Sequence, residues 1–167
     1  MQLVIFTLDT QRFALHLPAV VRVLPAMEIT PLPNAPFAVA GLVNLEKTLL
    51  PVFNTRRRFG FPERDLDPGD RFIVARTRNK TILLVVDDVT GVSDYPEDRV
   101  VLQDTTPGIN ELVSGVIMLD DGLVYIHDLD SFLSSEEEIH LDEALLQFTK
   151  TNQSSNPEEK RKVKSDG

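Results

Sequence analysis

The sequence predicts an all-β fold built from a duplicated unit. Short apolar runs alternate with polar turns, at a spacing typical of a small β-barrel or β-sandwich rather than of a βαβ sheet. Residues 41–60 show the unit most clearly: an apolar strand, a tight polar turn, a second apolar strand and a short basic helical turn closed by glycine. Adding 74 to each number leads into residues 115–133, which repeat the pattern without a gap, so that Gly41 corresponds to Gly115.

The first hairpin also has a counterpart. Residues 3–8 and 13–17 are apolar runs around a polar turn, and residues 72–76 and 81–86 repeat this arrangement. An offset of 69 aligns apolar positions of the two copies: Phe13, Leu17, Val20 and Val23 with Ile82, Val86, Val89 and Val92. A longer loop around residues 94–110 accounts for the difference between the two offsets.

Prolines and glycines mark the connections between strands. Pro18 fits the first position of a short helical turn, whereas the prolines from residue 25 to residue 36 predict an extended, irregular segment. Pro51 lies inside an apolar run and indicates an edge strand or a bulge. The acidic residues 61–70 contain proline and glycine and form the predicted seam between the two halves.

A helix is predicted to follow the second copy. Residues 135–138 carry a capping-box pattern, with three carboxylates at the positive end of the helix. The next apolar residues form a roughly helical stripe: Ile139, Leu141, Leu145, Leu146 and Phe148. Beyond this stripe the chain has little to bury. We therefore assign residues 1–150 to one domain with two repeated subdomains, and residues 151–167 to a disordered tail.

Composition excludes several functional classes. The chain has no cysteine, which rules out disulfides, a thiol nucleophile and cysteine metal clusters. Its formal charge of -9 argues against nucleic acid as a partner. The apolar runs fall short of the ~20 residues of a membrane span, and the N-terminus lacks the basic segment of a signal peptide. We expect a soluble, cytoplasmic protein with no direct membrane insertion.

Few residues support catalysis. His16 lies on the polar register of a strand, where an exposed histidine is expected. His127, Asp128 and Asp130 could present a metal-binding face, but the corresponding residues of the first copy, Phe53, Asn54 and Arg56, do not form such a ligand set. The sequence contains no glycine-rich phosphate loop, nucleophile elbow or zinc spacing. We therefore expect neither an enzyme nor a cofactor or metal site.

Two charged clusters have simple structural interpretations. Asp87 and Asp88 are adjacent, so in a strand their side chains would point to opposite faces and could not act together as an acid–base pair. We interpret them instead as acidic residues of a turn or loop. The run Arg56–Arg58 is interpreted as solvated charge that complements a helix dipole, with contact to an acidic partner as the alternative.

A family resemblance covers about residues 2–148. It rests on the order and spacing of several segments: residues 3–8, 13–15 with the turn at Val20, 33–37, 41–45, 51–56, 85–89 and the repeat that begins at Gly115. In this order they resemble the bacterial and archaeal chemotaxis coupling-protein (CheW) family. The resemblance implies two intertwined five-stranded SH3-like β-barrels with a hydrophobic groove between them.

The resemblance also implies a function and its sites. The protein would be a stand-alone, non-enzymatic adaptor that links the cytoplasmic tip of a methyl-accepting chemoreceptor to the regulatory domain of a CheA-type histidine kinase, recruited to membrane-associated receptor arrays. The implied receptor-binding residues are Leu17, Val20, Arg22, Gly41, Asn44, Glu46, Val86 and Val89. The implied kinase-binding loop runs from Val101 to Thr105.

One departure from the family pattern bears on partner choice. The family has Asn-Leu-Arg-Gly where this chain has residues 44–47, Asn-Leu-Glu-Lys, so one charge is reversed and a glycine that tolerates positive φ is lost. We expect a partner with a compensating change, or a divergent paralogue. The alternatives are a barrel that modulates a kinase outside chemotaxis, a small-ligand-binding barrel, and a metal-assisted hydrolase that uses His127, Asp128 and Asp130.

Overall fold

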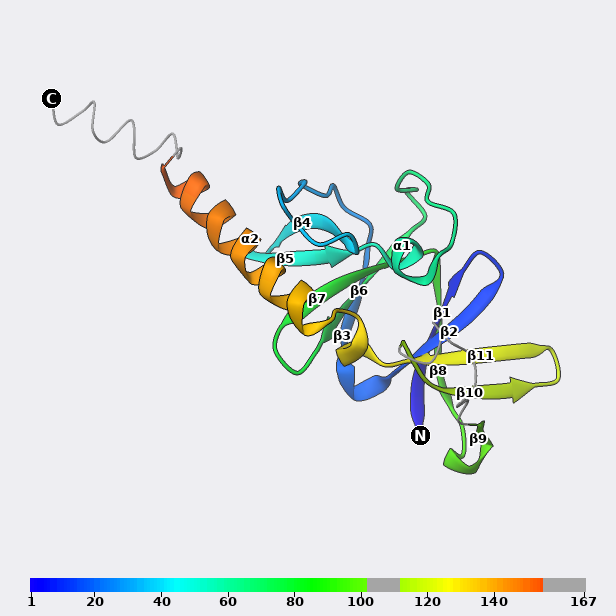
Figure 1. Ribbon diagram of the computed structural model, residues 1–167. Coiled ribbons are helices and arrows are strands. Elements are labelled where there is room, and N and C mark those ends of the chain that lie inside the picture. The colour runs from blue at the N-terminus through cyan, green and yellow to red at the C-terminus, as the bar shows by residue number, and fades with distance from the viewer. Residues whose placement is uncertain (102–111, 155–167) are drawn as a thin grey trace, which may run out of the picture.

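The computed structural model describes residues 1–101 and 112–154, which form two β-sheets and one long helix (Figure 1). The elements in chain order are β1 (Gln2–Leu8), β2 (Gln11–His16), η1 (Leu17–Ala19), β3 (Val20–Pro25), β4 (Val39–Leu45), β5 (Thr48–Phe53), α1 (Thr55–Phe59), β6 (Arg71–Arg76), β7 (Thr81–Val86), β8 (Asp88–Asp94), η2 (Glu97–Arg99), β9 (Val100–Val101), β10 (Val113–Leu119), β11 (Gly122–His127), η3 (Leu129–Ser131) and α2 (Ser135–Ser154).

The chain passes from one sheet to the other twice. The six-stranded sheet has the order β8-β1-β2-β11-β10-β9, and the five-stranded sheet has the order β3-β6-β7-β5-β4. The first crossover is η1, which joins β2 to β3, and the second is the single residue Asp87 between β7 and β8. The chain therefore changes sheets at η1 and at Asp87. The loop at residues 61–70, where the two sequence repeats meet, is not such a point, because it joins α1 to β6 and the strands before and after it lie in the same sheet.

The duplication predicted from the sequence is reproduced in the strands. Adding 74 to the bounds of β4 and β5 gives the bounds of β10 and β11. Each strand of the first half has a counterpart in the second: β1 with β6, β2 with β7, β3 with β8, β4 with β10 and β5 with β11. Exchanging every strand for its counterpart turns the order β8-β1-β2-β11-β10 of one sheet into the order β3-β6-β7-β5-β4 of the other. Each sheet thus combines the first hairpin of one half with strands of the other half, three in the five-stranded sheet and four in the six-stranded sheet. This confirms the all-β, intertwined architecture.

The hydrophobic core repeats in the same way. Each sheet has its own cluster of six buried residues, and the offsets of 69 and 74 match the two clusters one to one: Leu3, Ile5, Ala14, Ile117, Val124 and Ile126 in the six-stranded sheet, and Phe72, Val74, Leu83, Val43, Leu50 and Val52 in the five-stranded sheet. A third, larger cluster contains residues of both sheets and of α2. Burial of this shared apolar surface holds the two sheets together.

Gly41 and Gly115 occupy equivalent bulges where another segment lies over the strand. The register of β4 shifts between Val39 and Gly41, and that of β10 shifts between Val113 and Gly115. A Cβ atom on Gly41, whose φ is 154°, would lie 2.2 Å from the carbonyl oxygen of Thr30. A Cβ atom on Gly115 would lie 2.4 Å from Cγ1 of Val100. Glycine is required at both places because the covering segment leaves no room for a side chain.

Pro51 differs from its expectation. Its strand, β5, lies inside the five-stranded sheet between β7 and β4, and is not an edge. The proline is accommodated because only Val52 and Phe53 of β5 pair with β7, so Pro51 precedes the paired stretch on that side. The bulge in this region belongs to the neighbouring strand β4.

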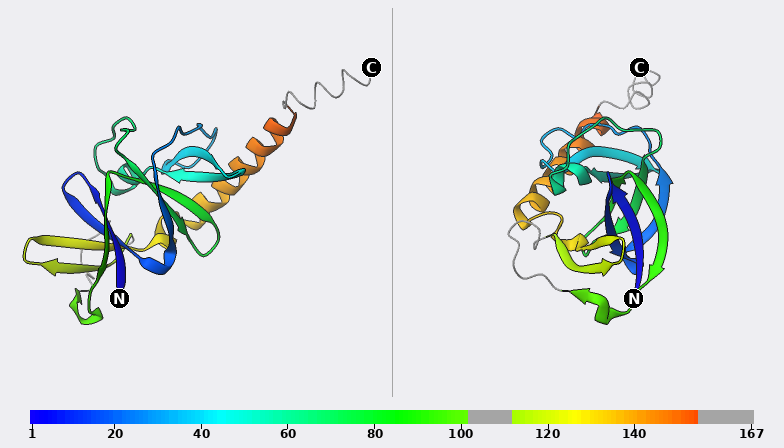
Figure 2. Two further views of the ribbon diagram at one scale, coloured as in Figure 1. Left: turned by 180° about the vertical axis from the view of Figure 1, so that it is seen from behind. Right: turned by 90° about the vertical axis from the view of Figure 1, so that its right-hand side faces the viewer.

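Helix α2 begins with a capping box formed by Ser134 and Glu137, one residue earlier than predicted. The helix then runs beyond the body of the molecule (Figures 1 and 2). Oγ of Ser134 accepts a hydrogen bond from the backbone N–H of Glu137, and a Glu137 carboxylate oxygen accepts one from the N–H of Ser134. Leu141 and Ala144 are buried in the shared core. Two members of the predicted stripe instead face outward, since Ile139 and Leu146 are exposed.

The end of α2 also differs from the sequence expectation. The helix continues through Ser154, four residues into the segment that was expected to be disordered. Residues 155–167 lie outside the described part of the chain.

His127 is a core residue of the second copy. Its sequence counterpart is Phe53, and both side chains contact the ring of Phe132, with centroids 5.2 Å and 4.8 Å away respectively. Nδ1 of His127 lies 2.7 Å from the carbonyl oxygen of Leu112, which can only accept, so Nδ1 carries the proton. Complete burial disfavours the imidazolium form and lowers the pKa of His127 to about 4.

The cover over Gly41 gives a steric prediction. Gly41→Ala should lower the free energy of unfolding by about 1–3 kcal/mol, because the new methyl group must displace the backbone of Thr30. Gly91→Ala is the matched control: Gly91 also has positive φ, 134°, but no atom lies within 4 Å of its Cβ position. Urea unfolding monitored by circular dichroism measures the free energy of unfolding of both variants. Equal losses in the two variants would contradict the steric explanation.

The buried imidazole gives a pH prediction. The unfolded chain protonates His127 near its ordinary pKa of 6.5, whereas the folded protein resists protonation down to about 4. The stability that results is present above pH 6.5 and is lost as the pH falls toward 4, a difference of about 3 kcal/mol. His127→Phe should therefore show a smaller fall in unfolding free energy over this range. His16→Ala, which removes an exposed histidine, should keep the wild-type profile. Superimposable profiles for His127→Phe and the wild type would refute this account.

Candidate binding site at the two strand crossovers

Four of the expected receptor-binding residues lie at the two crossovers between sheets. Leu17 begins η1 and Val20 begins β3, so they flank the first crossover. Val86 ends β7 and Val89 is the second residue of β8, so they flank the second. These pairs are equivalent under the offset of 69, which places the two halves of the expected site at matching positions of the duplicated fold. We call Leu17, Val20, Val86 and Val89 the crossover residues.

The crossover residues differ in exposure. Val86 is fully buried in the shared core. Val20 and Val89 are half-buried and pack against the same core cluster. Leu17 is also half-buried. Leu17, Val20 and Val89 can therefore offer apolar surface to a partner, whereas the side chain of Val86 is enclosed in the core.

Three further expected residues form a polar rim on the five-stranded sheet. Arg22 lies in β3, Asn44 lies in β4, and Glu46 lies in the turn after β4; all three are exposed. A guanidinium nitrogen of Arg22 lies 3.1 Å from a carboxylate oxygen of Glu46. Because β3 and β4 are the two edge strands, this ion pair shows that the sheet curls until its edges come within reach of two side chains (Figure 2).

The Glu46 turn combines strain with an internal charge partner. Glu46 and Lys47 both have positive φ, 52° and 69°, in the two-residue turn between Leu45 and Thr48. Such a turn favours glycine or asparagine, and each L side chain in this region costs roughly 1–2 kcal/mol. The sequence interpretation placed the compensating charge for Glu46 on a partner protein. The structure supplies one within the chain, Arg22.

The remaining expected residues are spread over other positions. Gly41 is buried beneath Thr30, where its role is steric. Val101 is 48% exposed on β9, at the edge of the six-stranded sheet opposite to the strand of Val89. Thr105 lies outside the described residues.

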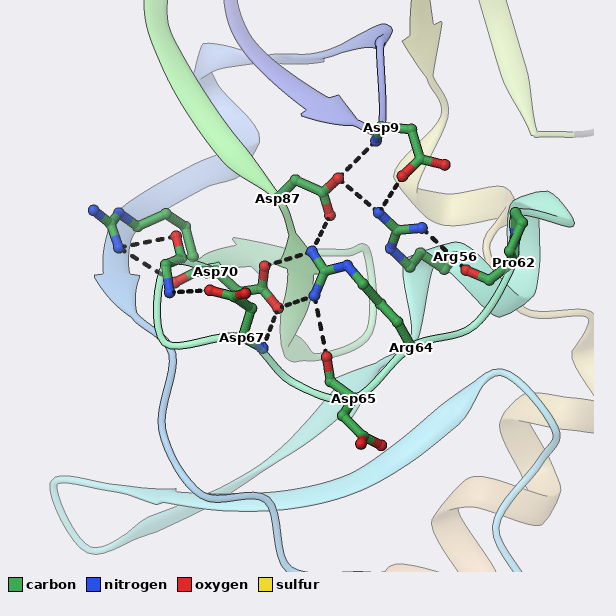
Figure 3. Close-up of polar contacts among 10 residues, drawn as sticks. Asp9, Arg56, Pro62, Arg64, Asp65, Asp67, Asp70 and Asp87 are labelled. Atoms are coloured by element: carbon green, nitrogen blue, oxygen red, sulfur yellow. Dashed lines mark hydrogen bonds and ion pairs between the residues drawn. The ribbon is translucent and has the colours of Figure 1, made fainter.

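Sequence reasoning missed a polar network beside the second crossover (Figure 3). One carboxylate oxygen of Asp87, Oδ2, accepts hydrogen bonds from the backbone N–H of Asp9 at 2.6 Å and from Nη2 of Arg56 at 2.7 Å. The other, Oδ1, accepts one from Nη2 of Arg64 at 2.8 Å. The backbone N–H of Asp87 donates to the carbonyl oxygen of Thr7 at 3.0 Å. Asp87 is thus a hydrogen-bonded residue that connects several segments, and not simply an acidic residue of a loop.

The network extends into the loop at residues 61–70. Both carboxylate oxygens of the buried Asp70 accept from the guanidinium of Arg64, at 2.7 and 2.9 Å. Burial opposes ionisation of Asp70, but hydrogen bonds from Arg64 and from the backbone of Asp67 outweigh it and lower its pKa. The hydrogen bond from Arg56 likewise lowers the pKa of Asp9. The side-chain hydrogen bonds to Asp9 and Asp87 raise the pKa of Arg56.

The basic run Arg56–Arg58 is used internally rather than left solvated. Arg56 is buried within the network. Arg57 pairs with Glu63 at 2.8 Å and its guanidinium carbon lies 5.0 Å from the ring centroid of Phe37. Arg58 pairs with Glu137 of α2 at 3.2 Å. The signal in the sequence was the basic run followed closely by the acidic loop, a pattern that fits intrachain pairing.

The possible metal-binding residues already have structural partners. Asp128 accepts hydrogen bonds from the backbone N–H of Asp130 and from the hydroxyl of Ser131. Asp130 accepts one from the backbone N–H of Arg78. In the described residues, no group of three or more His, Cys, Asp or Glu side chains could hold a metal ion. The same part of the chain contains no helix that is both long and apolar enough to span a membrane.

Comparison with known proteins identifies the family. The model of the CheW-like domain matches residues 2–137. A chemotaxis protein CheW from Thermotoga maritima is 28% identical over 142 residues, which covers 84% of this chain and 90% of the relative. One from Treponema pallidum is 25% identical over 142 residues, which covers 81% of this chain and 84% of the relative.

A solved structure shares the fold. The scaffolding protein TtCheW from Thermoanaerobacter tengcongensis superimposes with a TM-score of 0.74 at 25% sequence identity, and the match covers 81% of this chain and 89% of that protein. The family match spans both halves of the duplication and both crossovers, and it ends just inside α2. The chain belongs to the CheW-like domain family.

Proposed function

We propose that this protein is a chemotaxis scaffold that couples the cytoplasmic tip of a methyl-accepting chemoreceptor to the regulatory domain of a CheA-type histidine kinase. Its membership of the CheW-like family supports a scaffolding role, because relatives are described as chemotaxis proteins and one as a scaffolding protein. We further propose that it acts in the cytoplasm at membrane-associated receptor arrays, and that it has no catalytic activity.

The observation that carries the receptor proposal is that three crossover residues, Val20, Val86 and Val89, belong to or pack against one core cluster. Val20 and Val89 come from different halves of the sequence, yet both pack against the shared cluster in which Val86 is buried. Half-buried apolar side chains on a rigid sheet can serve as anchors for an amphipathic receptor helix. A site assembled from both halves exists only in the folded, intertwined protein.

Arg22, Asn44 and Glu46 would form the polar edge of the receptor site. The Arg22–Glu46 ion pair is exposed, so its own contribution to stability is small. A receptor that contacts this rim would meet a pair whose charges are already balanced. We therefore propose that this rim sets partner choice through hydrogen-bond geometry, and that the crossover residues supply most of the affinity.

The kinase would bind at the edge strand β9 of the six-stranded sheet. Val101 is exposed on this strand, whereas Val89 lies on the other edge strand, β8, and the rim lies on the five-stranded sheet. Binding of the two partners to different strands would allow the scaffold to hold both at once. Contacts of modest strength on each surface suffice in an array, because many linked sites act together.

A charge placed at Val20 tests the receptor site. Val20→Asp should weaken binding to a receptor tip fragment by at least roughly thirtyfold, since an unpaired carboxylate would be desolvated at the centre of the contact. Affinity is measured by titration calorimetry, with circular dichroism and thermal unfolding as checks on the fold. Leu17→Ser provides a second, milder change in case Val20→Asp disturbs the half-buried packing.

Val21→Asp is the control for this test. Val21 is 56% exposed on the same strand, so the same charge is added where it remains solvated. Wild-type affinity is expected for this variant. If Val20→Asp and Leu17→Ser fold normally and still bind the receptor tip as tightly as the wild type, the proposed receptor site is wrong.

A further inference from the structure

The two crossovers are built differently although they occupy equivalent positions. The first is the helical turn η1, in which Pro18 fixes one backbone torsion and the N–H of Val20 donates to the carbonyl oxygen of Leu17. The residue equivalent to Pro18 under the offset of 69 is Asp87. The second crossover therefore lacks proline and depends on the bonds that Asp87 makes to other segments.

Those bonds attach Asp87 to three separate parts of the chain. The turn between β1 and β2 contributes the N–H of Asp9, α1 contributes Arg56, and the loop at residues 61–70 contributes Arg64. Figure 3 shows the two guanidinium groups directed at different oxygens of the Asp87 carboxylate. Charge-assisted hydrogen bonds of this kind are short, directional and stronger than neutral ones.

The position of Asp87 makes these bonds consequential for the binding surface. Val86, on one side, is fully buried and fixed by the core. Val89 follows two residues later in β8, an edge strand that is exposed over most of its length. The carboxylate thus fixes the chain at the point where it leaves the core and enters the exposed strand that carries Val89.

We infer that Asp87, held by Arg56 and Arg64, is a positioning residue that sets the placement of Val89 relative to Val20. This rests on the proposed receptor function, because its consequence is a binding surface ready for the receptor helix. One crossover is thereby fixed by proline and the other by an ionic clamp, which we define as Asp87, Arg56, Arg64 and the backbone N–H of Asp9. Removing the clamp should impair receptor binding selectively and leave kinase binding intact.

The test compares two affinities in one variant. Asp87→Asn keeps the size of the side chain but removes its charge. It should weaken binding to a receptor tip fragment by roughly three- to thirtyfold while the affinity for the kinase regulatory domain stays within about twofold. Asp88→Asn is the matched control, because this neighbouring carboxylate is exposed. Equal losses for both partners, or equal effects of Asp87→Asn and Asp88→Asn, would overturn the inference.

A double-mutant cycle tests whether Arg64 acts through Asp87. Arg64→Met should weaken receptor binding in the wild-type background and have little further effect in the Asp87→Asn background. Additive effects would show that Arg64 acts independently and would contradict the clamp.

A measurement without any partner separates this inference from the proposed function. Amide hydrogen exchange in β8 should accelerate in Asp87→Asn, while exchange in β3 stays at the wild-type rate. Unchanged exchange in β8 would refute the clamp. If the exchange result holds but wild-type protein fails to bind any receptor tip, the clamp stands and the receptor function fails.

Discussion

The exchange of strands between the two halves is the constraint on which the rest of the structure depends. Neither half can form its sheet alone, because each sheet takes its first hairpin from one half and its remaining strands from the other. The matched core clusters show that equivalent residues of the two halves form the core of each sheet. The exchange requires the chain to cross between sheets twice, and four of the residues expected to bind a receptor lie at those two crossings. The fold and the position of the candidate site therefore both follow from the exchange of strands between the two halves.

Duplication leaves the two halves free to diverge where the core does not restrain them. Proline at one crossover corresponds to the clamped Asp87 at the other, and a buried phenylalanine in one half corresponds to a buried neutral histidine in the other. The contact between Arg56 and Asp9 also has a counterpart, Asp130 with Arg78, in which the charges are exchanged and the bond runs to the backbone. The apolar framework is thus conserved within the molecule, while polar residues give each half its own connections.

The sequence was sufficient for the repeats and for the strands of the four hairpins, because both depend on local periodicity and on self-similarity at a fixed offset. It was insufficient for contacts between distant segments. Arg56 and Asp87 are 31 residues apart, and their pairing depends on how the two sheets meet. Arg22 and Glu46 meet only because the five-stranded sheet curls, so an internal partner for Glu46 could not be predicted from either strand alone. The burial of Val86 likewise depends on the shared core rather than on its own strand.

A scaffold must hold both partners at the same time, and this property separates it from a protein that modulates a kinase alone. The most direct measurement is sedimentation velocity of this protein mixed with a receptor tip fragment and a kinase regulatory domain, each also examined in pairs. We expect both binary complexes and, in the full mixture, a single faster species that contains all three chains. Mutually exclusive binding, or binding to the kinase domain without any binding to the receptor tip, would contradict the proposed coupling role.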